Sequence, residues 1–361
     1  MDHKSFHKNL KINGVSFISV DEVLKYAHVF SYDIFVFLES WFSNTETIAV
    51  KSSGSTGKPK TILLQKKQMI NSAFVTGKYF DLQEDTTALL CLPIAYIAAK
   101  MMLIRAIILG WHIDVIKSNS NPLKDIHKTY DFSAMVPLQL DNSLSKIDII
   151  KKIIVGGGVV SNSLQGRLQT ISSQVFATYG MTETITHIAV KRLNNFGLSS
   201  SLSMQEKSFY QILPNITIYK DERNCLVIKA PKISKEIIFT NDVVNLISDV
   251  QFEWVGRFDN VINSGGIKLH PEKIEEKLSK IIFNRFFVAG IPDEKFGEKL
   301  VLIIENDNSN EIKKSIFQKI KLMQSLSKFE TPKETYFLKE FVETKTGKIQ
   351  RIETIAKIFL E

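Results

Sequence analysis

The sequence predicts an α/β protein with two domains, and three observations lead to this prediction. The chain has 361 residues, more than a single hydrophobic core usually organises. Short β-branched runs alternate with helix-like stretches, which favours a mostly parallel sheet with helices beside it. After about residue 257 the pattern changes, so we expect a large N-terminal α/β domain at 1–257 and a small C-terminal α+β domain at 258–361.

The runs that predict strands in the large domain end in Gly, Ser or Pro turns. They are TIAVKSS at 47–53, WHIDVI at 111–116, KIIVGGG at 152–158 and QVFATYG at 174–180. Helix-like stretches lie between them, at 66–79 and 161–171. Ligands of such sheets bind in the loops after the carboxyl ends of the strands, so the Gly-rich segments at these ends predict a ligand site.

The small domain is predicted from a different order of segments. The Gly-containing stretch GRFDNVINSGG leads into HPEKIEEKLSK, where Pro271 suits the first turn of a helix and acidic residues follow it. The run FFVAGI then predicts a strand.

The formal net charge of +8 could indicate nucleic acid or a membrane surface as partner. The lysines are spread along the chain, however, and no cluster of Lys, Arg and aromatic residues suggests nucleic-acid binding. A solvated basic surface, or a cleft for an anionic substrate such as ATP, explains the charge better.

Other features favour a cytoplasmic protein. Cys91 and Cys225 both occur in apolar, strand-like runs, which predicts two unpaired core thiols. The first residues contain no apolar stretch typical of a signal peptide. The longest uncharged apolar run, residues 88–99, is too short to span a bilayer and contains Pro93.

The segment SSGSTGKPK, from Ser52 to Lys60, is the first that carries chemistry. Glycines let backbone N–H groups approach phosphate oxygens, hydroxyls donate further hydrogen bonds, and lysine adds positive charge. Its spacing is not that of a Walker A loop. The alternative interpretation is a flexible Ser/Gly turn.

The segment ATYGMTETITH predicts a strand that ends in a loop bearing Thr182 and Glu183. A carboxylate beside a phosphate loop can hold Mg²⁺, which prefers one or two carboxylates together with phosphate oxygens. The alternative is a carboxylate that caps a helix.

Three further residues are candidates. Asp242 in FTNDVV can accept hydrogen bonds from ribose hydroxyls, and Arg257 in WVGRFDN can bind hydroxyl or phosphate oxygens. Lys348 lies in TKTGKIQR, where a Gly-Lys turn could present it to an active site. Each has an alternative as a charged surface residue.

Taken together and in this order, these segments resemble the adenylate-forming superfamily of acyl-CoA synthetases, luciferases and peptide-synthetase adenylation domains. The resemblance covers about residues 47–361 and implies ATP, Mg²⁺ and coenzyme A as ligands. The implied nucleotide-binding residues are Ser52, Ser53, Gly54, Ser55, Thr56, Gly57, Lys60, Gly156, Gly157, Gly158, Tyr179, Asp242 and Arg257.

The resemblance also implies the remaining roles. Thr182 would touch the α-phosphate, Glu183 would bind Mg²⁺, and Lys348 would act in adenylation. Asp259 matches the hinge, and Gly265 and Gly266 match the stretch beside the pantetheine tunnel. In the transition state, Lys348, the metal and the loop amides would neutralise the negative charge that grows at the α-phosphate.

The segments LPIAYIAAKMMLIRA and YGMTETITHIAV are most similar to compact o-succinylbenzoate–CoA ligases of menaquinone biosynthesis. The expected acid is then an aromatic dicarboxylate, and the candidate residues for binding it are Tyr96, Lys100, Arg105 and His187.

The sequence also departs from the family's pattern. The family's usual histidine in the first segment is absent, and Asn260 stands where an acidic residue is common. Alternatives are a ligase for another aryl or fatty acid, an amino-acid adenylating domain or a nucleotide-binding pseudoenzyme. The sequence leaves open whether the chain forms a homo-oligomer.

Overall fold

The computed structural model describes residues 2–51, 60–194, 209–306, 310–344 and 349–359. Its α-helices are α1 (Val20–Phe30), α2 (Tyr32–Phe42), α3 (Lys66–Phe80), α4 (Ile97–Leu109), α5 (Pro137–Asn142), α6 (Asn162–Leu168), α7 (Pro271–Leu278), α8 (Asn310–Lys321) and α9 (Arg351–Ile358). The strands of the first half are β1 (Lys11–Ile12), β2 (Val15–Ser16), β3 (Thr47–Lys51), β4 (Thr61–Gln65), β5 (Thr87–Leu90), β6 (His112–Val115), β7 (Tyr130–Met135), β8 (Ile150–Val155), β9 (Gln174–Gly180) and β10 (His187–Arg192). The later strands are β11 (Tyr210–Ile212), β12 (Thr217–Lys220), β13 (Cys225–Lys229), β14 (Ile238–Ser248), β15 (Gln251–Arg257), β16 (Ile262–Ser264), β17 (Ile267–Leu269), β18 (Phe286–Asp293), β19 (Gly297–Glu305) and β20 (Glu334–Leu338).

A 13-stranded sheet crosses the large unit in the order β12-β13-β14-β15-β11-β10-β9-β8-β7-β5-β6-β1-β2. The strands from β9 to β1 pair in parallel, and the strands from β12 to β9 pair antiparallel. The predicted α/β class is confirmed, but the expected mostly parallel pairing holds for only one half of the sheet. The reason is connectivity: helices link the parallel strands, whereas short turns link pairs such as β14 and β15, and such turns reverse the chain.

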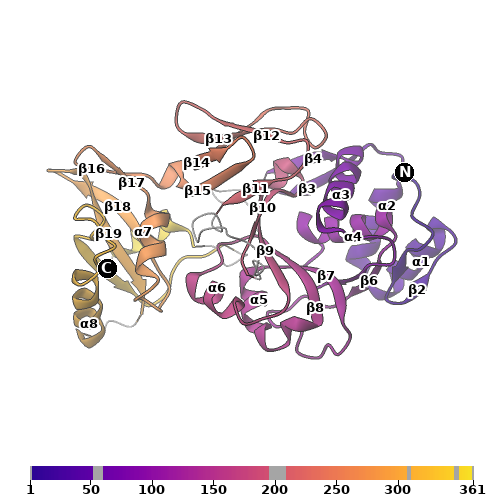
Figure 1. Ribbon diagram of the computed structural model, residues 1–361, viewed down its shortest axis with the longest axis horizontal. Coiled ribbons are helices and arrows are strands. Elements are labelled where there is room, and N and C mark those ends of the chain that lie inside the picture. The colour runs from indigo at the N-terminus through magenta and orange to yellow at the C-terminus, as the bar shows by residue number, and fades with distance from the viewer. Residues whose placement is uncertain (1, 52–59, 195–208, 307–309, 345–348, 360–361) are drawn as a thin grey trace.

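Helices cover both faces of the parallel half (Figure 1). Alternate strand residues point to opposite faces: Leu89 packs in one core, while its neighbours Ala88 and Leu90 pack in the other. Helices α1 to α4 contribute to the core that contains Ala88, and α5 and α6 contribute to the core that contains Leu89. The sheet is therefore held from both sides, which gives its carboxyl-end loops a rigid base.

The predicted strand at 47–53 is β3, but it lies outside the large sheet. It pairs antiparallel with β4 in a separate two-stranded sheet. Lys66, directly after β4, is fully buried, and its ammonium group donates a 2.9 Å hydrogen bond to the carbonyl of Ser43 at the end of α2. This hydrogen bond links the end of the β3–β4 hairpin to the end of α2.

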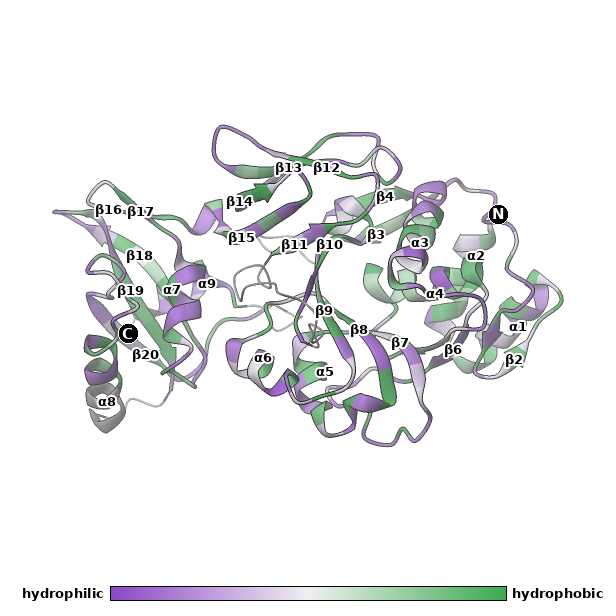
Figure 2. Ribbon diagram, viewed as in Figure 1, coloured by the Kyte–Doolittle hydropathy of each residue, from purple (hydrophilic) through white to green (hydrophobic). Residues whose placement is uncertain are grey.

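A second sheet forms the small unit, with β17, β16, β19 and β18 in line and β20 paired parallel to β19. Helix α7 begins at Pro271, as predicted, and its Ile274 and Leu278 are buried in the small core. Figure 1 places α7 between this sheet and the large unit, and Figure 2 shows hydrophilic residues along the helix.

Two further expectations can be compared with the fold. Cys91 and Cys225 are both buried and form no disulfide, which confirms the predicted core thiols. Among the helices in the described ranges, none combines the length and the apolar character that a bilayer-crossing helix needs.

Candidate active site

The carboxyl ends of β8 and β9 meet at one edge of the sheet, because these strands are parallel neighbours with Val155 opposite Ala177. Gly156 to Gly158 follow β8 directly, and Gly156 donates a backbone hydrogen bond to the carbonyl of Met135. A Cβ atom at Gly156 would lie 2.7 Å from the hydroxyl oxygen of Thr178, so only glycine fits there. The structure thus brings the predicted glycine segment beside the end of β9.

Tyr179, at the end of β9, connects this edge to the antiparallel half of the sheet. Its phenol donates a 2.7 Å hydrogen bond to Oδ2 of Asp242 on β14. Burial, and then the negative charge of Asp242, raise the pKa of Tyr179 well above its ordinary value, so the phenol keeps its proton and acts as a donor.

The other carboxylate oxygen of Asp242 is also engaged. It accepts a 3.1 Å hydrogen bond from the indole N–H of Trp254, and the Arg257 guanidinium lies 3.8 Å away. Asp242 and Arg257 stand opposite each other in the pairing of β14 with β15. The structure therefore brings together Tyr179, Asp242 and Arg257, three of the predicted nucleotide-binding residues.

Thr182 and Glu183 lie in a short 3-10 turn, η2 (Thr182–Thr184), directly after β9. The Glu183 carboxylate is exposed, and Thr182 is partly buried. β4 lies next to η2, so the β3–β4 hairpin and Glu183 are neighbours. The predicted phosphate-loop residues Ser52, Ser53, Gly54, Ser55, Thr56 and Gly57 connect β3 to β4 but lie outside the described residues. Lys60, directly before β4, is described and exposed.

A strained backbone conformation follows η2 at Ile185. This residue is β-branched and fully buried, yet it has φ +66° and ψ −54°. The N–H of Thr186 donates to the carbonyl of Thr184 across it at 2.7 Å, which closes a three-residue γ-turn. The Thr184 hydroxyl supports this turn by accepting from the Met181 N–H at 2.9 Å. Such strain persists only where the surrounding contacts over-determine it, and it is common at functional sites.

Thr184 and Ile185 are not among the site residues predicted from the sequence. The local sequence TETIT gives no signal of a positive φ at Ile185, because a β-branched residue rarely adopts it. Gly180 could have given a hint. A Cβ atom at Gly180 would lie 2.3 Å from the Thr186 carbonyl, so the glycine allows the chain to return closely beside β9.

Arg105 and His187, two of the candidates for binding the acid, lie together inside the large unit. Arg105 is 1% exposed and donates a 3.1 Å hydrogen bond from Nη2 to the Thr186 hydroxyl. The same hydroxyl lies 3.1 Å from Nδ1 of His187. Burial, and then the charge of Arg105, lower the pKa of His187 well below its ordinary value, so the imidazole is neutral.

Among the described residues, Arg105 is a buried charge without a counter-ion. In the described part of the chain no carboxylate forms an ion pair with it, and its Nε has no hydrogen-bond partner. Burial lowers the pKa of its guanidinium to about 9. An unpaired buried charge is costly in free energy, because it loses its hydration without gaining an anionic partner.

The other two candidates are placed differently. Lys100 donates a 2.8 Å hydrogen bond to the carbonyl of Ile94, and its ammonium group lies 4.7 Å from the centre of the Phe37 ring. Lys100 therefore stabilises the turn before α4. Tyr96 lies in that turn and is 38% exposed.

The predicted hinge residue lies between the two units, and the predicted CoA-binding residues lie in the small unit. Asp259 lies in the turn η4 (Phe258–Asn260), and its Oδ2 accepts a 2.8 Å hydrogen bond from Arg257. Gly265 and Gly266 form the turn between β16 and β17, at the end of the small unit that is distant from β9 and β14 (Figure 1). The structure does not bring these two glycines to Tyr179 and Asp242. Lys348 lies outside the described residues.

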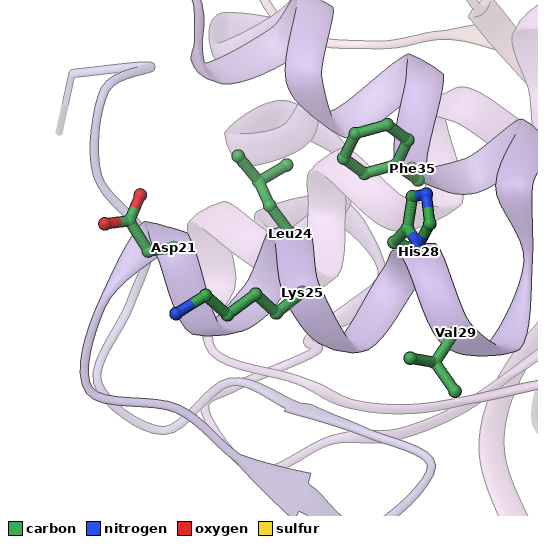
Figure 3. A pocket seen from close by; sticks show the side chains of 6 residues that line it. All are labelled: Asp21, Leu24, Lys25, His28, Val29 and Phe35. Atoms are coloured by element: carbon green, nitrogen blue, oxygen red, sulfur yellow. The ribbon is translucent and has the colours of Figure 1, made fainter.

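A shallow surface pocket also occurs on α1 and α2. The residues that line it are Asp21, Leu24, Lys25, His28, Val29 and Phe35 (Figure 3). None of the predicted site residues contributes to this pocket. It has no part in the arrangement described above.

Comparison with known proteins identifies the family. The family described as AMP-binding enzyme matches residues 50–219. A solved acyl-CoA synthetase (AMP-forming)/AMP-acid ligase II-like protein from Dyadobacter fermentans is 37% identical, with 90% of this chain and 93% of that chain covered and a TM-score of 0.57.

More distant relatives are similar over most of the chain. The 2-succinylbenzoate–CoA ligase of Enterococcus faecalis is 23% identical and covers 94% of this chain and 75% of its own length. The structure of o-succinylbenzoate coenzyme A synthetase (MenE) from Bacillus subtilis, in complex with ATP and magnesium ion, has a TM-score of 0.71 at 18% identity, with 94% of this chain and 82% of that chain covered. This chain therefore belongs to the AMP-binding enzyme family and is an AMP-forming acid–CoA ligase.

Proposed function

We propose that this enzyme converts o-succinylbenzoate to o-succinylbenzoyl-CoA, a step of menaquinone biosynthesis, through an acyl-adenylate. The observation that carries the choice of acid is the unpaired, buried guanidinium of Arg105. Relatives from Enterococcus faecalis and Lactococcus lactis with the name 2-succinylbenzoate–CoA ligase support the same choice.

The chemistry of the acid explains the need for Arg105. o-Succinylbenzoate has two carboxylates, and only one of them is activated. The second stays ionised, so its entry into a buried pocket is costly unless a cation receives it. Arginine suits this task because its planar guanidinium can bind both carboxylate oxygens. A fatty acid or simple benzoic acid has no second carboxylate and would leave Arg105 unpaired.

The nucleotide fits the arrangement around Asp242. Its carboxylate, held by Tyr179 and Trp254, would accept hydrogen bonds from the ribose hydroxyls, and Arg257 would bind beside it. Gly156, Gly157, Gly158 and Tyr179 would line the adenine pocket. The segment Ser52–Lys60 would bind the phosphates, with Thr182 at the α-phosphate.

A magnesium ion fits Glu183. In the described ranges no three His, Cys, Asp or Glu side chains converge as a metal site. A single exposed carboxylate in η2, next to β4, suits an ion that takes its other ligands from phosphate and water, as Mg²⁺ commonly does. When bound, it would neutralise phosphate charge.

The thiol step would use the small domain. We propose domains at 1–257 and 258–361 with a hinge at Asp259, because the large sheet ends at Arg257 and the next sheet begins at Ile262. Rotation about Asp259 would exchange Lys348, which acts in adenylation, for Gly265 and Gly266, which border the CoA tunnel.

The direct test is a panel of acids in which pyrophosphate release is measured with and without CoA. o-Succinylbenzoate should have the highest kcat/KM, and 4-oxo-4-phenylbutanoate, which lacks its aromatic carboxylate, should be about 10²–10³-fold poorer, because a buried charged partner is then unpaired. A fatty or simple benzoic acid that outpaces o-succinylbenzoate would disprove the choice of acid, although the chain would still be an acid–CoA ligase.

A variant links this preference to Arg105. Arg105→Met should remove most of the preference for o-succinylbenzoate over 4-oxo-4-phenylbutanoate, and Arg105→Lys should retain part of it. The matched control is Arg167→Met, since Arg167 forms a surface ion pair with Asp141. If Arg105→Met keeps the full preference, another residue binds the second carboxylate.

A further inference from the structure

Helix α7 has two distinct faces. Ile274 and Leu278 are buried in the core of the small unit, whereas Lys273 and Glu276 lie on the side toward the large unit. The helix packs against β15 of the large unit. The polar face of α7 is therefore a docking face between the two units (Figure 1).

The strongest contact of this face is the ion pair of Lys273 with Glu253 on β15. Both side chains are about two-thirds or more buried, with 32% and 27% exposed. The second oxygen of Glu253 accepts a 3.1 Å hydrogen bond from Asn245. Burial alone would raise the pKa of Glu253, but the hydrogen bonds from Lys273 and Asn245 lower it. The carboxylate is thus ionised and oriented at neutral pH.

A second contact binds the carboxyl end of α7. Asn162, the first residue of α6, donates a 3.1 Å hydrogen bond from Nδ2 to the carbonyl of Glu276, and Nδ2 lies 3.4 Å from the hydroxyl of Ser279. The last four carbonyls of a helix have no partner within the helix. Asn162, from the large unit, supplies a hydrogen-bond donor for one of these carbonyls, that of Glu276.

The charges across the interface are complementary. Lys191 on β10 is largely buried, which lowers its pKa, while the negative charge of Glu276 acts in the opposite direction. Lys273 forms an ion pair with Glu253 across the interface and lies 3.5 Å from Glu276 on its own helix, and the negative charges of Glu276 and Glu253 both act on Lys191, so each unit presents one positive and one negative group. Reversing either pair would set like charges together, so this pattern specifies one orientation.

We propose that Lys273, Glu253 and Asn162 are positioning residues that hold the small unit in the orientation for acyl-adenylate formation. This inference rests on the proposed function, with its two half-reactions. In the present orientation the Gly265–Gly266 turn is distant from β9 and β14, so it cannot serve the thiol step. α7 must leave β15 before that step, and the strength of these contacts sets how often it does.

The consequence is a shift in the balance of half-reactions. Weakening a contact that exists in only one of two orientations lowers the population of that orientation, by a factor set by the free energy of the lost contact. A half-buried ion pair of this kind corresponds to about a three- to tenfold change. Adenylation should become slower relative to thioester formation.

The experiment uses the full-length protein and measures two rates. The first is single-turnover pyrophosphate release with ATP and o-succinylbenzoate, and the second is thioester formation from supplied acyl-adenylate and CoA. The ratio of the first to the second should fall about three- to tenfold in Lys273→Met and in Glu253→Gln. The conservative variant Lys273→Arg should keep the ratio within about twofold of the wild type, because the arginine retains a cation that can pair with Glu253.

Lys277→Met is the matched control. Lys277 lies on the same helix with the same 32% exposure, but its partner, Glu330, belongs to the small unit. This variant should leave the ratio unchanged. A general loss of stability would slow both half-reactions together, which distinguishes it from a shift of orientation.

Amide hydrogen exchange provides a readout without substrate. Peptides that contain α7 and β15 should exchange faster in Lys273→Met than in the wild type, and Lys277→Met should leave β15 unchanged. An unchanged ratio and unchanged exchange in both single variants would overturn the positioning role. If the wild type forms no acyl-adenylate from any acid of the panel, the proposed function fails instead, and the exchange experiment still tests the docking contact.

Discussion

The phenol of Tyr179 donates a 2.7 Å hydrogen bond to Oδ2 of Asp242, a residue 63 positions further along the chain. Trp254 holds the other oxygen of the same carboxylate. The three side chains come from three different strands, β9, β14 and β15, so the sheet itself sets their geometry. The carboxylate is therefore held in one orientation, which would lower the entropy cost of the ribose contact that we propose for it.

Asp242→Asn should weaken ATP binding. The amide has nearly the same shape, but it loses the negative charge and one acceptor oxygen, so the Kd for ATP should rise about ten- to a hundredfold. Tyr179→Phe should cause a smaller rise, since it removes only the hydrogen bond that orients Asp242. Titration calorimetry measures both values. Asp249→Asn, at an exposed position after β14, is the control, and equal affinity of Asp242→Asn and this control would contradict the role.

Glu183→Gln should change the dependence on Mg²⁺. Loss of the carboxylate ligand should raise the Mg²⁺ concentration for half-maximal pyrophosphate release about tenfold or more, while saturating Mg²⁺ recovers part of the rate. Glu222→Gln, at an exposed position between β12 and β13, is the matched control. If Glu183→Gln releases pyrophosphate at the wild-type rate at ordinary Mg²⁺ concentrations, Glu183 is not a ligand of the metal.

The positions of individual strands, helices and turns depend mostly on residues that are neighbours in the chain, and local signals in the sequence predicted several of them. Pro271 predicted the start of α7, the strand at 174–180 corresponds to β9, and the helix at 66–79 corresponds to α3, which ends one residue later. The glycines at 156–158 predicted a turn after a strand because a close backbone approach leaves a compositional trace.

The contacts between distant segments could not be predicted in the same way. No property of Tyr179 or Trp254 alone indicates that both reach Asp242, because the pairing of β9, β14 and β15 is decided by the whole sheet. Arg105 was a candidate for its charge, but its burial without a carboxylate depends on how α4 packs under Thr186. The strain at Ile185 contradicts the local preference of a β-branched residue, so only the fold explains it.

Lys348→Ala should separate the two half-reactions. A lysine that neutralises charge in the transition state commonly contributes about 10²–10³ in rate, so acyl-adenylate formation should slow by about this factor. Thioester formation from supplied acyl-adenylate should change much less, because the small domain would have moved Lys348 away. Lys345→Ala is the control and should matter little. Equal slowing of both half-reactions by Lys348→Ala would exclude the alternation of domains, and a stronger effect of Lys345→Ala would assign the role to that residue.

His187 makes the stability of the fold depend on pH in a defined window. In the folded protein, burial and the neighbouring charge of Arg105 keep its pKa well below 6.5, whereas in the unfolded chain it is near 6.5. Below pH 6.5 the unfolded chain therefore binds one proton more at this site than the folded protein does. The free energy of unfolding should fall as the pH falls, with a slope from this residue that approaches about 1.4 kcal/mol per pH unit.

His187→Gln removes this group. The unfolding free energy of the variant, measured by urea denaturation between pH 6.5 and 5, should therefore depend less steeply on pH than that of the wild type. The slope tests the argument even if the variant is less stable at every pH. His127→Gln, at an exposed position, should keep the wild-type slope. Parallel curves for His187→Gln and the wild type would mean that His187 takes up its proton in the folded protein, and its neutral contact with Thr186 would then be wrong.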